Sequence, residues 1–422
     1  MLHTRPGHEN IAAPLISVVM ANYQAGTKIV RALDSVLNQS VESLEVIVSD
    51  DASGDDSVAL VRQAMSADGR VRLIEAERNG GPARARNRAL DAARGQWVAV
   101  VDADDIIHPE RFERLLAAAS HFGADVVADD LLHFHEDGSP VTFLLGDKPQ
   151  RPFAVTAEDW VLAGTRANTA PLGYLKPMIK AETLGSIRYD ETLRIGEDYD
   201  LLLRVLLTGA NFHVIPVPWY LYRRHSSSIS HRLSADDVGS MIGNQQRLIE
   251  QEGPFPESLQ SALDQRMQGL EGRHVYETLV AAIKRRDIAA AARLLAGRPT
   301  LALRLWHSLA DGQRNRSTLR RDGPIPGPAV LRLSGEPTTT ADASKRQVPP
   351  YVAATATDWD QPSPRQILAD LANLGGGRDL KTVCDDIAGT YAAGFIPAAR
   401  LEIVSRPVAE GAVLDRVGVA AK

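Results

Sequence analysis

Residues 97–105 read WVAVVDADD, an apolar run of strand length that stops at three aspartates. The first five residues are typical of a buried strand. Residues two apart in an extended chain point the same way, so Asp102 and Asp104 can face one ligand, with Asp105 on the following turn. Clustered carboxylates have raised pKa values unless a cation compensates them. Mg²⁺ or Mn²⁺ is the natural cation, because such ions take oxygen ligands and commonly use one or two carboxylates plus substrate phosphates.

Two other interpretations of these aspartates stay open. They could form a solvated acidic turn that caps a helix starting near Pro109. An Asp-x-Asp after a strand also opens the haloacid-dehalogenase-type phosphatases. Against that second interpretation, Ile106 stands where those enzymes carry Thr or Val, and this strand is about the fourth of the chain rather than the first.

The sequence before this strand alternates strand-like and helix-like segments. Apolar runs predict strands at 15–22, 44–49 and 71–76, and helical patterns are predicted at 27–38, 55–67 and about 82–95. This alternation is typical of βαβ units and of a mostly parallel α/β sheet. Ligands of such sheets bind beyond the carboxyl ends of the strands. Both acidic clusters, Asp50/Asp51 and the one after residue 101, are predicted at such ends.

Length, net charge and cysteine content limit the classes of protein to which the chain can belong. Its 422 residues exceed one small domain, and the net charge of −6 gives no global basic field for nucleic acid. A single cysteine, Cys384, excludes a disulfide framework and a Cys-rich zinc site, which favours a reducing cytoplasmic setting. We find no signal-peptide pattern at the N-terminus and no apolar run of the roughly 18–20 residues that span a membrane.

The predicted domain organisation follows composition. Residues 1–13 form a tail, 14–235 the α/β domain, and 236–321 a helical region, within which 284–321 is rich in Lys and Arg. Residues 322–363 are rich in Pro, Gly, Ser and Thr, which predicts a disordered linker. Residues 364–422 are expected to form a small module of unknown role. The basic stretch at 284–321 could lie on an anionic membrane surface or form a solvated helical face.

Six segments, in order over about residues 14–231, resemble the family 2 glycosyltransferases with the GT-A fold. The first two lie at 14–57, where VLNQS and SDDASGDDS match closely, although Gln24 replaces the common Asn. The others are NGGPARARNRAL at 79–90, DADD at 102–105, GEDYDLLLR at 196–204 and YRRHSSSIS at 222–230. Within the family, the chain most resembles glycosyltransferases of succinoglycan-type exopolysaccharide assembly. The resemblance implies a GT-A nucleotide-sugar-binding fold, a mostly parallel sheet flanked by helices, with a helical C-terminal extension.

The resemblance also implies a donor site. Asp51 matches the aspartate that bonds the uracil ring, which favours a UDP-sugar, while Asp50 is expected to be structural. Ala21 and Tyr23 match the loop against which the base packs, although Tyr23 could equally be ordinary core. Asp102 matches the ribose contact.

The remaining roles concern the diphosphate, the metal and catalysis. Asp104 matches the metal ligand, with Asp105 as a second candidate. One arginine of the segment at 79–90 is expected at the diphosphate, and Arg84 is preferred to Arg86, although Arg on such a helix could simply be solvated. The other expected roles are Asp198 as catalytic base, Glu197 as a helix cap or acceptor contact, and His225 near the metal or pyrophosphate.

The implied function is an inverting, metal-dependent, non-processive transfer of a sugar from a nucleotide-sugar to a glycan or lipid-linked saccharide. The processive members carry a Q..RW motif and transmembrane helices, and neither is found here. The expected location is cytoplasmic, with peripheral attachment to the inner face of the membrane left open. Two alternatives remain: a catalytically inactive glycosyltransferase-like binding subunit, or a nucleotidyltransferase.

Overall fold

The computed structural model describes residues 13–135, 142–146, 151–165, 169–224, 233–298, 300–302 and 305, and the backbone of 330–334 and 400–404. The predicted linker over 322–363 and module over 364–422 lie outside these residues, except for two short strands. These strands are β11 (Val330–Ser334) and β12 (Arg400–Val404), which pair antiparallel. The predicted tail over 1–13 lies outside the described residues except for residue 13.

The first half of the domain has the predicted alternation of strands and helices. Its elements are β1 (Ile16–Asn22), α1 (Lys28–Leu37), β2 (Leu44–Asp50), α2 (Ser57–Ala67), β3 (Val71–Glu75), α3 (Pro82–Ala92) and β4 (Trp97–Val100). β1 lies between β2 and β4, β3 lies outside β2, and all three pairings are parallel. Every residue of β2 is buried, as expected for a central strand of a sheet that helices cover.

The second half completes a mixed sheet. Its elements are β5 (Ile106–Ile107), α4 (Arg111–Phe122), β6 (Val126–His135), β7 (Thr142–Phe143), β8 (Phe153–Val155), α5 (Ala157–Leu162), the 3-10 turn η1 (Leu172–Tyr174), β9 (Met178–Lys180), α6 (Ala181–Leu184), α7 (Glu197–Leu207) and β10 (Phe212–Arg224). The strand order is β3-β2-β1-β4-β9-β6-β10-β5, with β7 on β6 and β8 on β10. β9 runs antiparallel to both β4 and β6, so the sheet is parallel from β3 to β4 and mixed from β9 onward.

The last strand of the domain, β10, is long and continuous with the site. β10 pairs with β6 along its length, and the register shifts between Ile215 and Tyr220. Pro216 and Pro218 lie within this shift. Because proline has no N–H to donate to a neighbouring strand, the ladder is interrupted there and resumes after it. The resumed part carries Tyr220 to the edge where the aspartates lie.

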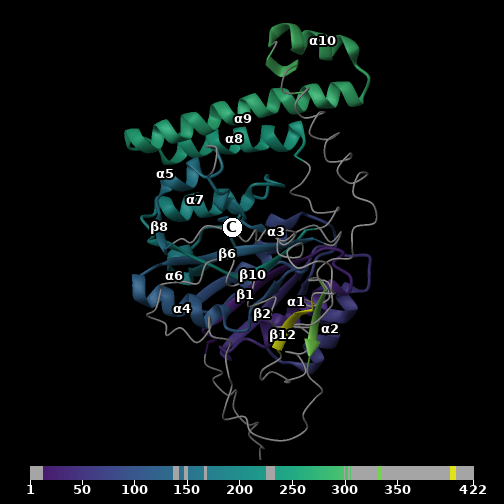
Figure 1. Ribbon diagram of the computed structural model, residues 1–422, viewed down its shortest axis with the longest axis vertical. Coiled ribbons are helices and arrows are strands. Elements are labelled where there is room, and N and C mark those ends of the chain that lie inside the picture. The colour runs from purple at the N-terminus through teal and green to yellow at the C-terminus, as the bar shows by residue number, and fades with distance from the viewer. Residues whose placement is uncertain are drawn as a thin grey trace, which may run out of the picture.

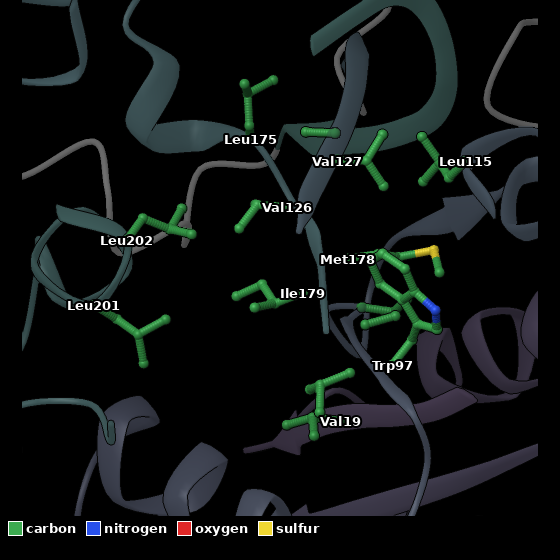
Figure 2. Packing of buried hydrophobic residues seen from close by; sticks show 14 of the residues in the cluster. Val19, Trp97, Leu115, Val126, Val127, Leu175, Met178, Ile179, Leu201 and Leu202 are labelled. Carbon is green, nitrogen blue, oxygen red and sulfur yellow. The ribbon is translucent and has the colours of Figure 1, made fainter. Parts of the chain in front are cut away.

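The core lies on both faces of the sheet (Figure 2). Val126 of β6 and Ile179 of β9 are paired and point towards Leu201 and Leu202 of α7. Their neighbours Val127 and Met178 point to the opposite side, where Leu115 of α4 packs. This alternation is the two-residue period of extended chains. The short β9 therefore joins the two layers and fixes the chain just before it.

Three helices follow the sheet: α8 (Ala235–Glu252), α9 (Glu257–Lys284) and α10 (Ile288–Gly297). α9 contacts α8, α5 and α10, and Figure 1 shows α8 and α9 side by side beyond α5 and α7, with α10 on the outer side of α9. The predicted helical extension is thus present over 235–297. No helix in the described part of the chain combines the length and the apolar character needed to cross a bilayer.

Candidate active site

The strand order reverses at β1, because β2 and β3 follow on one side while β4 lies on the other. Such a reversal opens a crevice at the carboxyl ends of the strands, where α/β proteins bind ligands. The chain turns there after Asn22, Asp50 and Val100. The predicted donor-site residues at 21–23, 50–51 and 102–105 therefore come to one edge, as the sequence indicates.

Asp50 holds the turns after β1 and β2 together. Its Oδ1 accepts hydrogen bonds from Asn22 Nδ2 at 2.6 Å and Ser53 Oγ at 2.6 Å, and its Oδ2 accepts one from the Ser53 N–H at 3.0 Å. The side chain is buried. This is the structural role expected of Asp50, and it leaves its neighbour Asp51 to point elsewhere.

Asp51 lies under the turn that begins α3. Its Oδ2 accepts the N–H groups of Gly80 at 2.9 Å and Gly81 at 2.7 Å, and its Oδ1 accepts Arg88 Nη2 at 2.9 Å. Gly81 has φ of 88°, a left-handed value that only glycine adopts at little cost. Asp51 thus shapes the loop beside the predicted base-binding position.

Tyr23 and Ala21 form the other wall of this part of the edge. Tyr23 is 51% exposed, which rules out the alternative that it is ordinary core. Gln24 and Ala52, which follow Tyr23 and Asp51, both have left-handed backbones, with φ of 52° and 63°. Such values are uncommon for residues other than glycine and tend to occur where a site constrains the chain.

Asp102 is bound by two buried cations. Its Oδ1 lies 2.9 Å from Arg86 Nη2, and its Oδ2 lies 2.9 Å from Lys176 Nζ. Arg86 comes from α3 and Lys176 from the segment before β9, and both are at most 5% exposed. Burial alone would raise the pKa of the Asp102 carboxyl, but Lys176 and Arg86 outweigh it and hold that pKa well below its usual range.

Asp198, the predicted base, belongs to the same cluster. Its Oδ2 lies 3.1 Å from Lys176 Nζ, its Oδ1 lies 3.4 Å from Arg86 Nη1, and Arg86 Nη1 also lies 2.8 Å from Glu197 Oε1. Both carboxylates lie in the first turn of α7, where the helix dipole favours negative charge. Gly196 precedes them with φ of 91°.

Glu197 and Asp198, the first two acids of α7, have pKa values shifted in opposite directions. Burial would raise the pKa of Asp198, yet Arg86 and Lys176 outweigh it and the net shift is downward. For Glu197, burial and the charge of Asp198 raise the pKa in spite of Arg86. The environment therefore favours an ionised Asp198, which is the state a base needs.

The three aspartates after β4 have separate surroundings. Asp105 is fully enclosed: its Oδ2 accepts the Tyr220 hydroxyl at 2.8 Å and its Oδ1 accepts the Arg223 N–H at 2.7 Å. Burial and then the charges of Asp104 and Asp102 raise its pKa well above the usual range. Tyr220 also accepts the Asp102 N–H at 3.1 Å. Asp105 thus fastens the aspartate loop to β10, while Asp104 is partly exposed at the edge.

One predicted residue, Arg84, stands apart from this cluster. Arg84 is on the outer side of α3 and pairs with Glu191 at 2.9 Å, so the structure brings Arg86, not the preferred Arg84, against Asp102. His225 lies outside the described residues. In the described ranges, which stop at 224 and resume at 233, no group of three or more His, Cys, Asp or Glu side chains could hold a metal ion.

The sequence reasoning missed Lys176 and did not predict that Arg86 pairs with Asp102. A signal existed for each residue. Lys176 stands between Leu175 and Met178 in an apolar segment, and a buried lysine requires an anionic partner. Arg86 shares the i, i+3, i+4, i+7 spacing of the buried face of α3, with Ala83 and Leu90.

The fold and this edge define an enzyme class. Residues 17–152 match the sequence profile described as Glycosyl transferase family 2. The chain is 36% identical over 284 residues to the succinoglycan biosynthesis protein ExoO of Rhizobium meliloti (strain 1021), a match that covers 66% of this chain and 80% of ExoO. The chain belongs to glycosyltransferase family 2, and it is a glycosyltransferase.

Other relatives agree in family and fold. The succinoglycan biosynthesis protein ExoU of the same organism is 34% identical over 230 residues, which cover 52% of this chain and 66% of ExoU. Among solved structures, residues 1–349 of S. aureus TarS in complex with UDP-GlcNAc superpose with a TM-score of 0.50 at 18% identity, over 68% of this chain and 91% of that one. The predicted GT-A fold, with helices flanking the sheet and a helical C-terminal region, is confirmed, and the sheet is mixed.

Proposed function

We propose that this chain transfers one sugar per encounter from a UDP-sugar to a saccharide acceptor in exopolysaccharide assembly, with inversion at the anomeric carbon. One observation carries the proposal: Asp198 and Asp102 lie in one cluster, held by the same two cations. This places the predicted base beside the predicted ribose contact. Both succinoglycan relatives support the exopolysaccharide assignment by their names.

The donor is proposed to lie across the carboxyl ends of β1, β2 and β4. Tyr23 offers an exposed ring for the base, and the carboxylate of Asp51, which is buried beneath the turn before α3, is the proposed acceptor for an imide N–H. The Asp51 Oδ1 accepts a hydrogen bond from Arg88, and a carboxylate oxygen can accept two. Uracil presents such an N–H, which is why UDP is the favoured nucleotide.

A divalent ion fits the chemistry of the edge. Asp104 supplies a partly exposed carboxylate, and Mg²⁺ or Mn²⁺ commonly binds through one or two carboxylates and the substrate's phosphates. We propose Asp104 as the principal ligand because it is partly exposed at the edge, whereas Asp105 is buried behind it. When bound, the ion would neutralise charge on the departing diphosphate.

The chain's own residues carry out the proton transfer. The acceptor hydroxyl gives its proton to Asp198 while its oxygen forms a bond to the anomeric carbon and the bond to the diphosphate oxygen breaks, with its electrons leaving on the nucleotide. Attack opposite the leaving group inverts the configuration and needs no covalent intermediate. Arg86 and Lys176 keep Asp198 oriented.

We further propose that the acceptor is lipid-linked and that the end of α9 and α10 meets an anionic membrane surface. Ile288 is 81% exposed and Ile283 is 44% exposed. The exposed cations near them in the sequence are Lys284, Arg285, Arg286, Arg293 and Arg298. Asp287 is an exposed anion in the same stretch. Each such cation near an anionic membrane contributes about 1 kcal/mol.

This surface can be tested by sedimentation with vesicles. Vesicles of phosphatidylcholine and phosphatidylglycerol should bind the protein in low salt, and vesicles of phosphatidylcholine alone should not. Replacing Lys284, Arg285 and Arg286 with Gln should abolish the difference. Equal binding to both vesicle types would contradict the membrane proposal.

The transfer proposal is tested by measuring nucleotide release with a panel of UDP-, GDP- and TDP-sugars, Mn²⁺ and saccharide acceptors. We expect release with a UDP-sugar, loss of donor binding in Asp104→Ala, and loss of turnover with retained donor binding in Asp198→Asn. Binding without turnover on any acceptor would favour the inactive binding subunit. Full activity of Asp198→Asn would refute the assignment of the base.

A further inference from the structure

Lys176 occupies an unusual position for a lysine. It is 5% exposed, although lysine is almost never buried unless it is paired. Its Nζ lies 2.9 Å from Asp102 Oδ2 and 3.1 Å from Asp198 Oδ2. One ammonium group thus bridges Asp102, the predicted donor contact, and Asp198, the predicted base for the acceptor.

The backbone of Lys176 is also fixed. Arg111 is fully buried and donates a hydrogen bond to the Lys176 carbonyl oxygen. The Arg111 guanidinium is itself held by Asp129, at 2.7 Å from Nη2 to Oδ1. Leu175 before Lys176 and Met178 after it are buried in the core. The segment that carries Lys176 is therefore held in place by the core. A side chain that is to fix the positions of two carboxylates needs such a rigid support.

We propose that Lys176 is a positioning residue for sugar transfer, which fixes the separation of Asp102 and Asp198 and keeps Asp198 ionised for proton removal. The inference rests on the proposed role of Asp198 as the base. Its physical basis is that a buried carboxylate favours its neutral form unless an opposite charge lies nearby. Arg86 lies 3.4 Å from Asp198 and also pairs with Glu197 and Asp102. The contact of Lys176 with Asp198 is shorter, at 3.1 Å.

The charged and titratable groups that influence Asp198 come from several elements. Arg86 and Lys176 lower its pKa, and Asp102 raises it. Glu197 on its own helix and Tyr189 before α7 also interact with its charge. Burial keeps the Tyr189 hydroxyl neutral by raising its pKa, so the negative neighbours of Asp198 are Asp102 and, when ionised, Glu197. Removal of Lys176 leaves Arg86 as the one cation among these named groups. The pKa of Asp198 should then rise.

The test compares Lys176→Met with wild type by the pH dependence of kcat/KM. Loss of an opposite charge within about 4–6 Å should move the acidic limb to higher pH by about 1–2 units. Lys176→Arg keeps the charge and should leave the limb in place. Lys180→Met is the matched control, because Lys180 lies on β9 and pairs with Asp125 at 2.8 Å, and it should also leave the limb in place.

A merely structural Lys176 would lower activity equally at every pH, and an acidic limb that stays in place in Lys176→Met would overturn the proposal. If Lys176→Met is recovered unfolded, Lys176→Gln provides the same comparison with a neutral hydrogen-bond donor. Results that contradict the proposed sugar transfer itself can be told apart from results that contradict the role of Lys176. In that case wild type turns over no nucleotide-sugar, or Asp198→Asn keeps full activity, whatever the Lys176 variants do.

Discussion

The buried pair between Arg111 of α4 and Asp129 of β6 links the core to the active site. Both side chains are fully buried, with Arg111 Nε 3.0 Å from each carboxylate oxygen of Asp129 and Nη2 2.7 Å from Oδ1. Arg111 also stacks 5.0 Å from the centre of the Tyr220 ring. Removing one member of such a pair leaves an uncompensated buried charge and costs about 3–5 kcal/mol. We therefore expect Arg111→Met to lower the free energy of unfolding by about that amount.

The assay is urea or thermal unfolding followed by circular dichroism. At about 2–4 °C per kcal/mol for a domain of this class, the midpoint should fall by roughly 10 °C. Arg114→Met is the matched control on the same helix. Arg114 pairs with Glu110 at 3.0 Å near the surface, where such pairs contribute about 0–1 kcal/mol.

The double variant Arg111→Met/Asp129→Val separates stability from function. Replacing a buried pair by apolar residues is often neutral, so we expect the double variant to unfold within about 1–2 kcal/mol of wild type. It should still transfer sugar more slowly, because the Lys176 carbonyl loses its donor. A single variant as stable as wild type, or a double variant no more stable than the single one, would refute the reasoning.

Three further predictions concern single residues. Burial raises the pKa of Asp130 to about 7, so the folded state binds a proton that the unfolded state releases at lower pH. The free energy of unfolding should therefore fall as the pH rises from about 4 to 7. Urea unfolding at pH 5 and 8 should show this loss in wild type and not in Asp130→Asn. Gly196→Ala places a side chain at φ of 91° and should cost about 1–2 kcal/mol and lower kcat, because this residue begins the helix that carries the predicted base. Tyr220→Phe removes a donor from buried Asp105 and an acceptor from the Asp102 N–H, and should cost about 1–3 kcal/mol in thermal unfolding.

The first half of the fold was predictable because each of its strands is a continuous apolar run and each helix has a regular period. β1, β2, β3 and β4 fall within a residue or two of the predicted segments. β9 was missed because it has three residues, Met178–Lys180, too few for any period to show. Its antiparallel direction depends on the partners β4 and β6, which are far from it in sequence.

The site was predictable where acidic residues follow strands and less so where cations come from elsewhere. Asp102 was singled out by its place after an apolar strand and Asp198 by the family resemblance, and the structure brings both into one cluster. Lys176 reaches the same cluster from a segment with no motif, and only the tertiary fold reveals its two partners. The pairing of Arg86 with Asp102 depended on which face of α3 is buried, and helical spacing could have indicated that face. Which arginine contacts the diphosphate stays a prediction.

The repulsion within WVAVVDADD is resolved differently for each aspartate. Asp102 is compensated by Arg86 and Lys176, and Asp105 is enclosed by Tyr220 and Arg223 with a raised pKa. Asp104 is partly exposed at the edge, where under the proposed function a divalent ion would bind its carboxylate together with the oxygens of an arriving diphosphate. Arg86 and Lys176 are already paired with Asp102, Glu197 and Asp198. The positive charge that compensates Asp104 and the diphosphate would therefore come with the donor.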